Sequence, residues 1–198
     1  MEDATLADLP RLVRVGDEVG WRGQLAMSTA AMVGAYGVAS WLFGSPLRTG
    51  DALLMALVAA VVGGGIAAFS SARRVRESVR ATASPPAAAV YETIADSRDR
   101  RQRTTLLLVF VAASLLIVDR IVGGGGLIAG LMIGLFGAVG AVDIVEARRW
   151  DVVEKAIRSF LYVLISPRGL AGGYGNVELF EIPREQEAGA PSDEGLEL

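Results

Sequence analysis

The residues of this sequence that could do chemistry are few, and most of them are carboxylates. The chain has no histidine and no cysteine, which removes the commonest metal ligand, the commonest acid–base group and all thiolate chemistry. Its one lysine, Lys155, lies in a helical pattern and not in a phosphate-binding loop. No nucleophile elbow of the GxSxG type is present. We therefore expect no enzyme and no cofactor.

Four acids are the best candidates for binding a hard cation. Asp143 and Glu146 are predicted on the same side of a membrane as Asp96 and Asp99, and carboxylate oxygens are the ligands that such ions prefer. Their spacing matches no known ligand set, and two arginines closely follow Glu146. The sequence therefore predicts no metal site.

Two other patterns resemble functional ones and have simpler explanations. Asp51 and Asp119 lie near apolar segments, where acids can relay protons or ions, but their positions at helix ends favour ordinary solvated charge. Gly124, Gly126 and Ala129 fit the dinucleotide pattern GxGxxG/A. That pattern requires a preceding strand, and here it begins an apolar span instead.

The elements that position these residues are apolar segments of membrane-spanning length. The mean hydropathy is +0.43, and 52% of the residues are apolar. Four apolar runs, at about 24–43, 52–70, 104–122 and 124–143, approach the length that a helix needs to cross the hydrocarbon core. We predict an all-α integral membrane protein, a helical bundle of four transmembrane helices in two hairpins, with a membrane domain over 24–145.

Small residues recur every fourth position in the second and fourth spans. Such stripes lie on one face of a helix and allow a second helix to approach closely. The segment 123–142 alone holds eight of the 24 glycines. We predict that the two stripes pack against each other within one molecule; they comprise Ala52, Ala56, Ala60, Gly64 and Ala68 in the second span and Gly126, Gly130, Gly134 and Ala138 in the fourth.

Basic residues predict the orientation. The short connections 44–51 and 119–123 contain Arg48 and Arg120 as their only basic residues. The positive-inside rule therefore places both termini and the central loop in the cytoplasm of a multi-pass protein of the cell membrane. Arginines next to the spans are expected to set this topology and to contact anionic lipid headgroups. These are Arg73, Arg74, Arg76, Arg100, Arg101, Arg103, Arg148 and Arg149.

Tryptophans are expected at the membrane surface. Trp21 and Trp41 bracket the first span, a separation of roughly 30 Å along a helix, which matches the two aromatic belts of a bilayer. Trp150 is predicted as a third interfacial anchor. Nucleic acid is not an expected partner, because Tyr91 is the only aromatic residue among the central arginines.

The segments outside the membrane are predicted to be mainly helical. After an N-terminal segment, 1–23, the first such element is a hairpin over 71–103, in which one helix ends near Ala83 and another begins near Pro86. An amphipathic helix follows over 146–165, with Glu154 and Arg158 as an i,i+4 pair on its polar side. A glycine-rich loop and short strand, 166–182, and a disordered acidic tail, 183–198, complete the chain.

The two halves of the membrane domain resemble each other. Each has a span, a short outer turn, a span with a small-residue stripe and then an Ala-Arg-Arg sequence, and the Ala-Arg-Arg sequences are 75 residues apart. Duplication of a two-span hairpin explains this pattern, as does the positive-inside rule alone.

These features describe well-specified packing surfaces without chemistry. We therefore expect an accessory or interaction component of a membrane assembly, whose partners are membrane lipids and either a second copy or another membrane protein. An oligomeric channel or facilitator-type transporter is the alternative. A membrane-bound lipid-modifying enzyme ranks third, because no nucleophile or metal cluster is visible.

Overall fold

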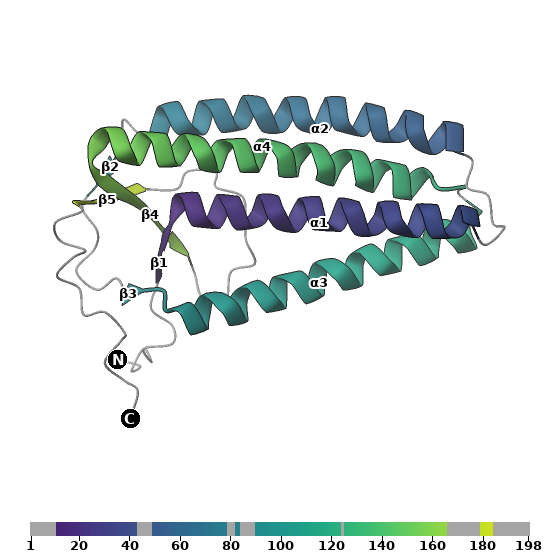
Figure 1. The fold of residues 1–198 in the computed structure, drawn as a ribbon, viewed down its shortest axis with the longest axis horizontal. Coiled ribbons are helices and arrows are strands. Elements are labelled where there is room, and N and C mark those ends of the chain that lie inside the picture. Colours follow the sequence, from purple (N-terminus) through teal and green to yellow (C-terminus); the bar gives the residue numbers. More distant parts are fainter. Residues whose placement is uncertain are drawn as a thin grey trace, which may run out of the picture.

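Four long helices and one small sheet make up the part of the chain that the structure describes. The structure is a computed structural model, and it describes residues 11–42, 49–78, 82–83, 90–123, 125–165 and 179–183. The helices lie side by side in the order α2, α4, α1, α3, with the sheet at one end (Figure 1). They are α1 (Val15–Leu42), α2 (Thr49–Ser78), α3 (Ile94–Ile121) and α4 (Leu127–Ile157).

The sheet gathers strands from three distant parts of the chain, in the order β2-β5-β4-β1-β3. Its long central strand, β4, is antiparallel to both β1 and β5, while the short strands β3 and β2 extend the two edges in parallel pairings. The all-α prediction is therefore too narrow, although four long helices dominate the fold. The strands are β1 (Arg11–Arg14), β2 (Thr82–Ala83), β3 (Val90–Tyr91), β4 (Ser159–Ile165) and β5 (Leu179–Pro183).

The amphipathic helix predicted over 146–165 is wrong in its second half. α4 continues without interruption from the fourth span to Ile157, and Arg158 then takes a left-handed conformation, with φ of 57°, that ends the helix. In β4, Leu161 and Val163 face the helices, whereas Tyr162 belongs to a second cluster on the opposite face of the sheet. Because both faces are buried, the strand is a continuous apolar run that periodicity cannot distinguish from a helix.

The helical hairpin predicted over 71–103 is also wrong in its middle. α2 ends at Ser78, and Ala83 lies in β2; Pro86 lies outside the described residues. α3 begins at Ile94, where the Thr93 hydroxyl accepts a hydrogen bond from the Asp96 N–H. That N-cap, and the pairing of β3 with β1, determine where the helix starts.

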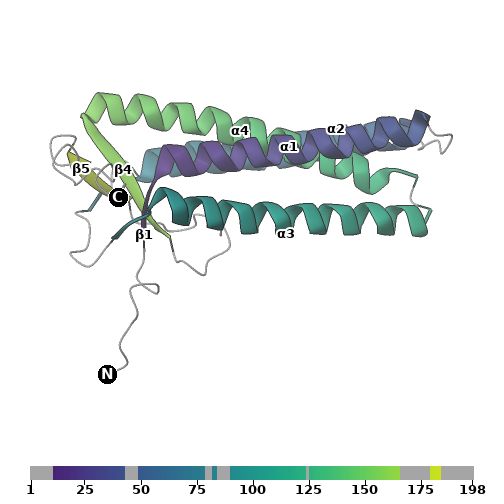
Figure 2. The ribbon, with the colours of Figure 1, turned by 60° about the horizontal axis from the view of Figure 1, so that its bottom comes forward.

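α4 is the central helix, because both α1 and α2 pack along its length; it lies between them in Figure 1 and crosses them in Figure 2. It runs parallel to α2, and a Cβ atom at Gly130 or Gly134 would overlap the backbone carbonyl of Ala52 or Ala56, respectively. The predicted stripes therefore meet. Gly126 does not belong to this contact as a helical residue, since it precedes α4 in a left-handed conformation.

α1 packs on another face of α4, in the antiparallel direction. A Cβ atom at Gly23 would lie 2.9 Å from the Gly140 carbonyl oxygen, and one at Gly20 would lie 3.5 Å from the Ala147 Cβ. Glycine and alanine thus bring α4 close to two neighbours at once. No matching contact joins α3 to α2 in the described chain, so the packing is not two-fold symmetric.

Three of the four helices are long and apolar enough to cross a membrane: Gly50–Val75, Ile94–Ile121 and Leu127–Ile157. The first predicted span, 24–43, overlaps α1 as far as Leu42, and over its described residues α1 is not among these three helices. α1 carries Gln24, Ser28 and Thr29 near its middle, and such polar residues lower its mean hydropathy. Four spans therefore remain a prediction.

Replacing both Gly130 and Gly134 by Leu should disrupt the α2–α4 crossing, because each new side chain must displace backbone. Overpacking typically costs about 1–3 kcal/mol per site, so we expect strongly reduced abundance and aggregation in detergent, measured by fluorescence-detected size exclusion. The matched control is Gly34→Leu with Gly65→Leu, since a Cβ at either glycine meets nothing within 4 Å. Equal behaviour of the two double variants would contradict the close crossing.

Arg158→Gly should stabilise the protein, because only glycine adopts the left-handed conformation without steric strain. We expect a gain of about 0.5–1 kcal/mol, seen as a rise of a few degrees in the thermal unfolding midpoint in detergent. Lys155→Gly, three residues earlier in helical conformation, should instead lower the midpoint, at a cost of about 1 kcal/mol. A lower midpoint for Arg158→Gly would contradict this reading.

Candidate functional site: a charged junction between helices and sheet

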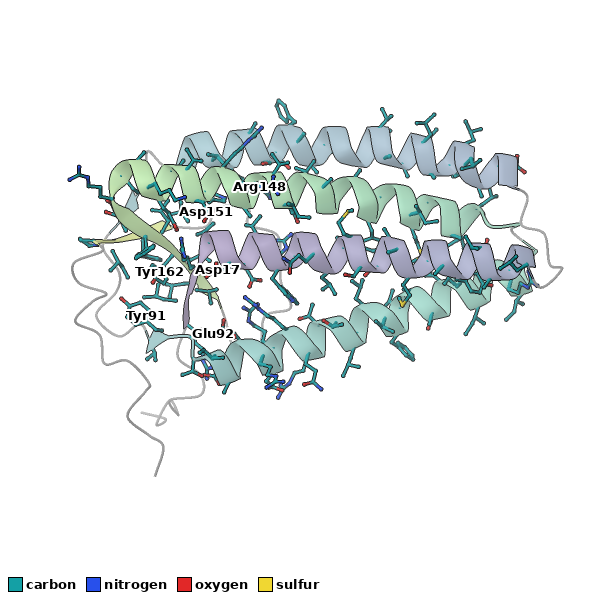
Figure 3. All side chains as sticks on the ribbon, viewed as in Figure 1. Asp17, Tyr91, Glu92, Arg148, Asp151 and Tyr162 are labelled. Carbon is teal, nitrogen blue, oxygen red and sulfur yellow. The ribbon has the colours of Figure 1, made fainter. Side chains whose placement is uncertain are left out.

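Charged side chains, among them Asp17, Glu92 and Asp151, lie where the helices join the sheet (Figure 3), and three further carboxylates of α1 and α4 are buried. Glu18 and Glu154 are 0% exposed and Glu146 is 2% exposed. Buried charges are costly unless they are paired and hydrogen-bonded, and each of these carboxylates has an arginine partner from a different element. We call this set the charged junction; it comprises Arg14, Glu18, Arg74, Glu92, Arg100, Glu146 and Glu154.

Arg100 of α3 holds two carboxylates at once. Its Nη1 and Nη2 donate to the two Glu18 oxygens at 3.0 and 2.8 Å, and its Nε and Nη2 donate to Glu92 at 2.8 and 3.0 Å. Paired, parallel hydrogen bonds of this kind are among the strongest and most directional in proteins. Glu18 lies in α1 and Glu92 follows β3, so one guanidinium joins α3, α1 and the edge of the sheet.

Glu154 plays the corresponding role at the end of α4. Arg14 of β1 donates from Nε to Glu154 Oε2 at 3.0 Å, and the Leu161 N–H of β4 donates to Oε1 at 3.1 Å. The hydrogen bond to Glu154 raises the pKa of Arg14. The predicted pairing of Glu154 with Arg158 is therefore not the one that forms, since this carboxylate points into the protein and joins two strands to the helix.

Trp150 is a core residue and not an exposed interfacial anchor. It is 2% exposed and packs among Val13, Leu161 and other residues of the sheet-side core. Its indole N–H donates to Glu146 Oε1 at 3.2 Å, and Arg74 of α2 donates to Oε2 at 3.0 Å. The apolar face of α4 around Trp150, which was expected to rest on the membrane, instead packs against the sheet.

The predicted topology arginines divide into inward and outward groups. Arg74 and Arg100 point inward to the junction, and Arg101 lies 5.5 Å from the ring centroid of the partly buried Trp21. The outward group is exposed at the helix surface and comprises Arg73, Arg103, Arg148 and Arg149. The side chains of Arg76 and Trp41 lie outside the described residues.

The four acids considered for a cation do not converge. Asp96 pairs with Arg11, Asp99 with Arg103, and Glu146 with Arg74, leaving Asp143 as a buried carboxylate on α4. Among the described residues, no group of three acids could hold a metal ion.

The two outer acids are not equivalent. Asp51 is exposed in the first turn of α2. Asp119 is 5% exposed, and its Oδ1 accepts a hydrogen bond from the Ile128 N–H at 3.4 Å. This carboxylate thus caps the start of α4, which Gly126 cannot do because it has no side chain.

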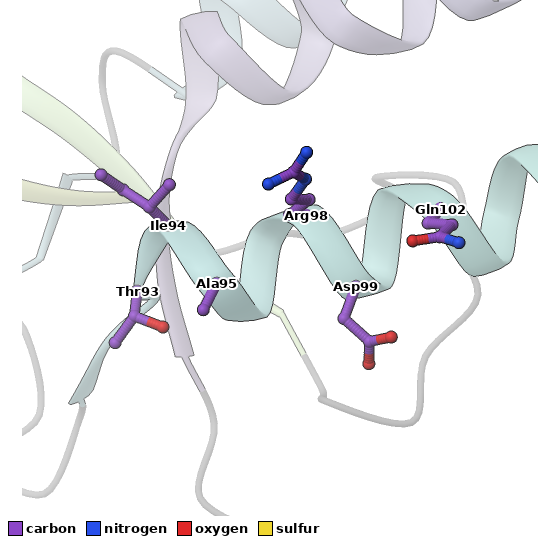
Figure 4. A pocket seen from close by; sticks show the side chains of 6 residues that line it. All are labelled: Thr93, Ile94, Ala95, Arg98, Asp99 and Gln102. Atoms are coloured by element: carbon purple, nitrogen blue, oxygen red, sulfur yellow. The ribbon is translucent and has the colours of Figure 1, made fainter.

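A shallow hollow of about 560 Å³ lies on the first turns of α3 (Figure 4). All six lining residues come from one segment, 93–102, and Arg98 and Asp99 supply its charges. Such a surface lacks the convergent groups of a catalytic site.

Comparison with known proteins provides no family assignment. No protein-family model, curated protein or solved structure matches this chain.

Arg100→Gln should destabilise the protein strongly, because it leaves Glu18 and Glu92 buried without their cation. Removing one partner of a buried ion pair typically costs about 3–5 kcal/mol, which we expect as a large fall in the thermal unfolding midpoint in detergent. The control is Arg103→Gln, whose pair with Asp99 is exposed and should contribute less than about 1 kcal/mol. The triple variant Arg100→Met, Glu18→Gln, Glu92→Gln should recover part of the lost stability, because it leaves no buried charge unpaired. Equal midpoints for Arg100→Gln and Arg103→Gln would contradict the assignment of Arg100 as the buried partner of both carboxylates.

Proposed function

We propose that this chain is a multi-pass protein of the cell membrane that acts as an accessory or interaction component of a membrane assembly. The observation that carries the proposal is the apolar exterior of two helices. Large apolar side chains are exposed on α2 from Leu53 to Phe69, and on α3 and its C-cap from Leu106 to Val122. Each stretch rises about 25 Å along its helix, close to the thickness of the hydrocarbon core.

The charged residues support one orientation for this domain. On α2 the apolar stretch is followed by Arg73, and on α3 it is preceded by Arg103. Arg73 lies in the last turns of α2 and Arg103 in the first turns of α3, and these ends of both helices are at the sheet end of the bundle (Figure 1). Under the positive-inside rule, the sheet end is cytoplasmic.

The sheet end is suited to present a surface to a partner. The charged junction fixes the sheet to α1, α3 and α4, so a partner bound to the sheet is held in a fixed position relative to these helices. At one edge, Val90 and Tyr91 of β3 are 45% and 46% exposed, and the neighbouring Ile94 is 82% exposed. Exposed apolar residues next to a strand edge are typical of binding surfaces.

A photo-crosslinking amino acid placed at Ile94 should capture a discrete protein in native membranes. The matched control is the same amino acid at Phe69, which is 74% exposed and faces the proposed hydrocarbon region. We expect a defined adduct from position 94. We also expect the captured protein to co-purify in fixed proportion when the protein is purified in mild detergent.

A monomer of 20.8 kDa without an adduct would contradict the interaction role. An ion or solute flux through that monomer or its homo-oligomer, alone in liposomes, would favour the channel or facilitator over the accessory role. Extraction of the protein from membranes by alkaline carbonate would contradict membrane integration itself.

A further inference from the structure

A cleft of about 330 Å³ opens between α1 and α3 at the end of the bundle remote from the sheet. Val33 of α1 and Ala112 of α3 are both 0% exposed and belong to one core cluster, together with Ala129 and Met132 of α4. Ala113, the next residue of α3, has a small side chain and lies in the wall of the cleft. The cleft is lined by Tyr36, Ala113, Leu116, Ile117, Arg120 and Ile121.

Arg120 is the one charged residue in this lining. It is exposed, and within the described ranges it forms no ion pair. The adjacent carboxylate, Asp119, is turned toward α4, where it accepts the Ile128 N–H. The cleft therefore has apolar walls and an uncompensated guanidinium at its outer end.

We propose that this cleft binds one anionic phospholipid, with a phosphate oxygen on Arg120 and part of an acyl chain along Ala113 and Ile117. The inference rests on the proposed membrane location. A guanidinium offers several donors in a geometry that suits phosphate, and the site lies at the end of a spanning helix, where headgroups are found.

The size and position of the cleft favour a lipid over a water-soluble ligand. Its volume is near the lower limit for small-molecule sites, so it accommodates part of a chain and not a whole lipid. It opens from α3, a helix apolar enough to cross a membrane, so lipid is the surrounding solvent. The phosphate supplies the negative charge that the protein does not place beside Arg120.

Native mass spectrometry of the protein from micelles containing equal amounts of phosphatidylglycerol and phosphatidylcholine tests this proposal. We expect the wild type to retain phosphatidylglycerol preferentially and Arg120→Gln to lose one tightly held molecule, with about a tenfold weaker affinity. Ala113→Phe, which fills the cleft, should lose the same molecule. Arg98→Gln, an exposed arginine at the other end of α3, should retain it.

Unchanged retention in Arg120→Gln, or equal retention of the two lipids by the wild type, would overturn the proposal. So would a dimer that Ala113→Phe dissociates, because a second copy would then occupy the cleft. Alkaline carbonate extraction of the same variants keeps the two proposals apart: a protein that stays in the membrane but shows no lipid preference contradicts the lipid site alone.

Discussion

The close approach of α4 to two neighbouring helices is the constraint on which the rest of the structure depends. In lipid, apolar side chains gain little from leaving their surroundings, so helices associate through dispersion contacts and backbone proximity. α4 meets this requirement on two faces, with Gly130 and Gly134 against α2 and Gly140 against α1. α3 lacks such a face and is attached more loosely, chiefly through the core cluster that contains Ala112, in its second half, and through Arg100, in its first half.

The charged junction joins these helices to the sheet. β1 runs directly into α1, and a single residue separates α4 from β4, so there is no loop to absorb a mismatch. The ion pairs connect positions that are 72, 82 and 140 residues apart in the chain. Because a buried carboxylate tolerates few alternative partners, these pairs favour one arrangement of strands and helices over others.

Much of the helical architecture was predictable from the sequence, because its signals are local. The stripes of small residues at Ala52–Ala68 and Gly130–Ala138 are periodic within single helices, and their mutual packing follows from that spacing. The sheet was not predictable in this way. β4 is buried on both faces and shows no alternation, while β2 and β3 have only two residues each.

The charged junction was hidden for a related reason. Glu154 follows Trp150 by one helical turn, a spacing that is compatible with an exposed ion pair on the same helix. Its actual partner, Arg14, lies at the other end of the sequence. A carboxylate on the same face as a buried tryptophan is the only local sign that such a residue points inward.

The position of β4 has a consequence for how the protein is made. β1 is synthesised near the start of the chain, yet its antiparallel partner emerges only after all four helices. β2 likewise waits for β5. The four helices can therefore pack together while the sheet is still in separate pieces, and closure of the sheet is a late step in folding.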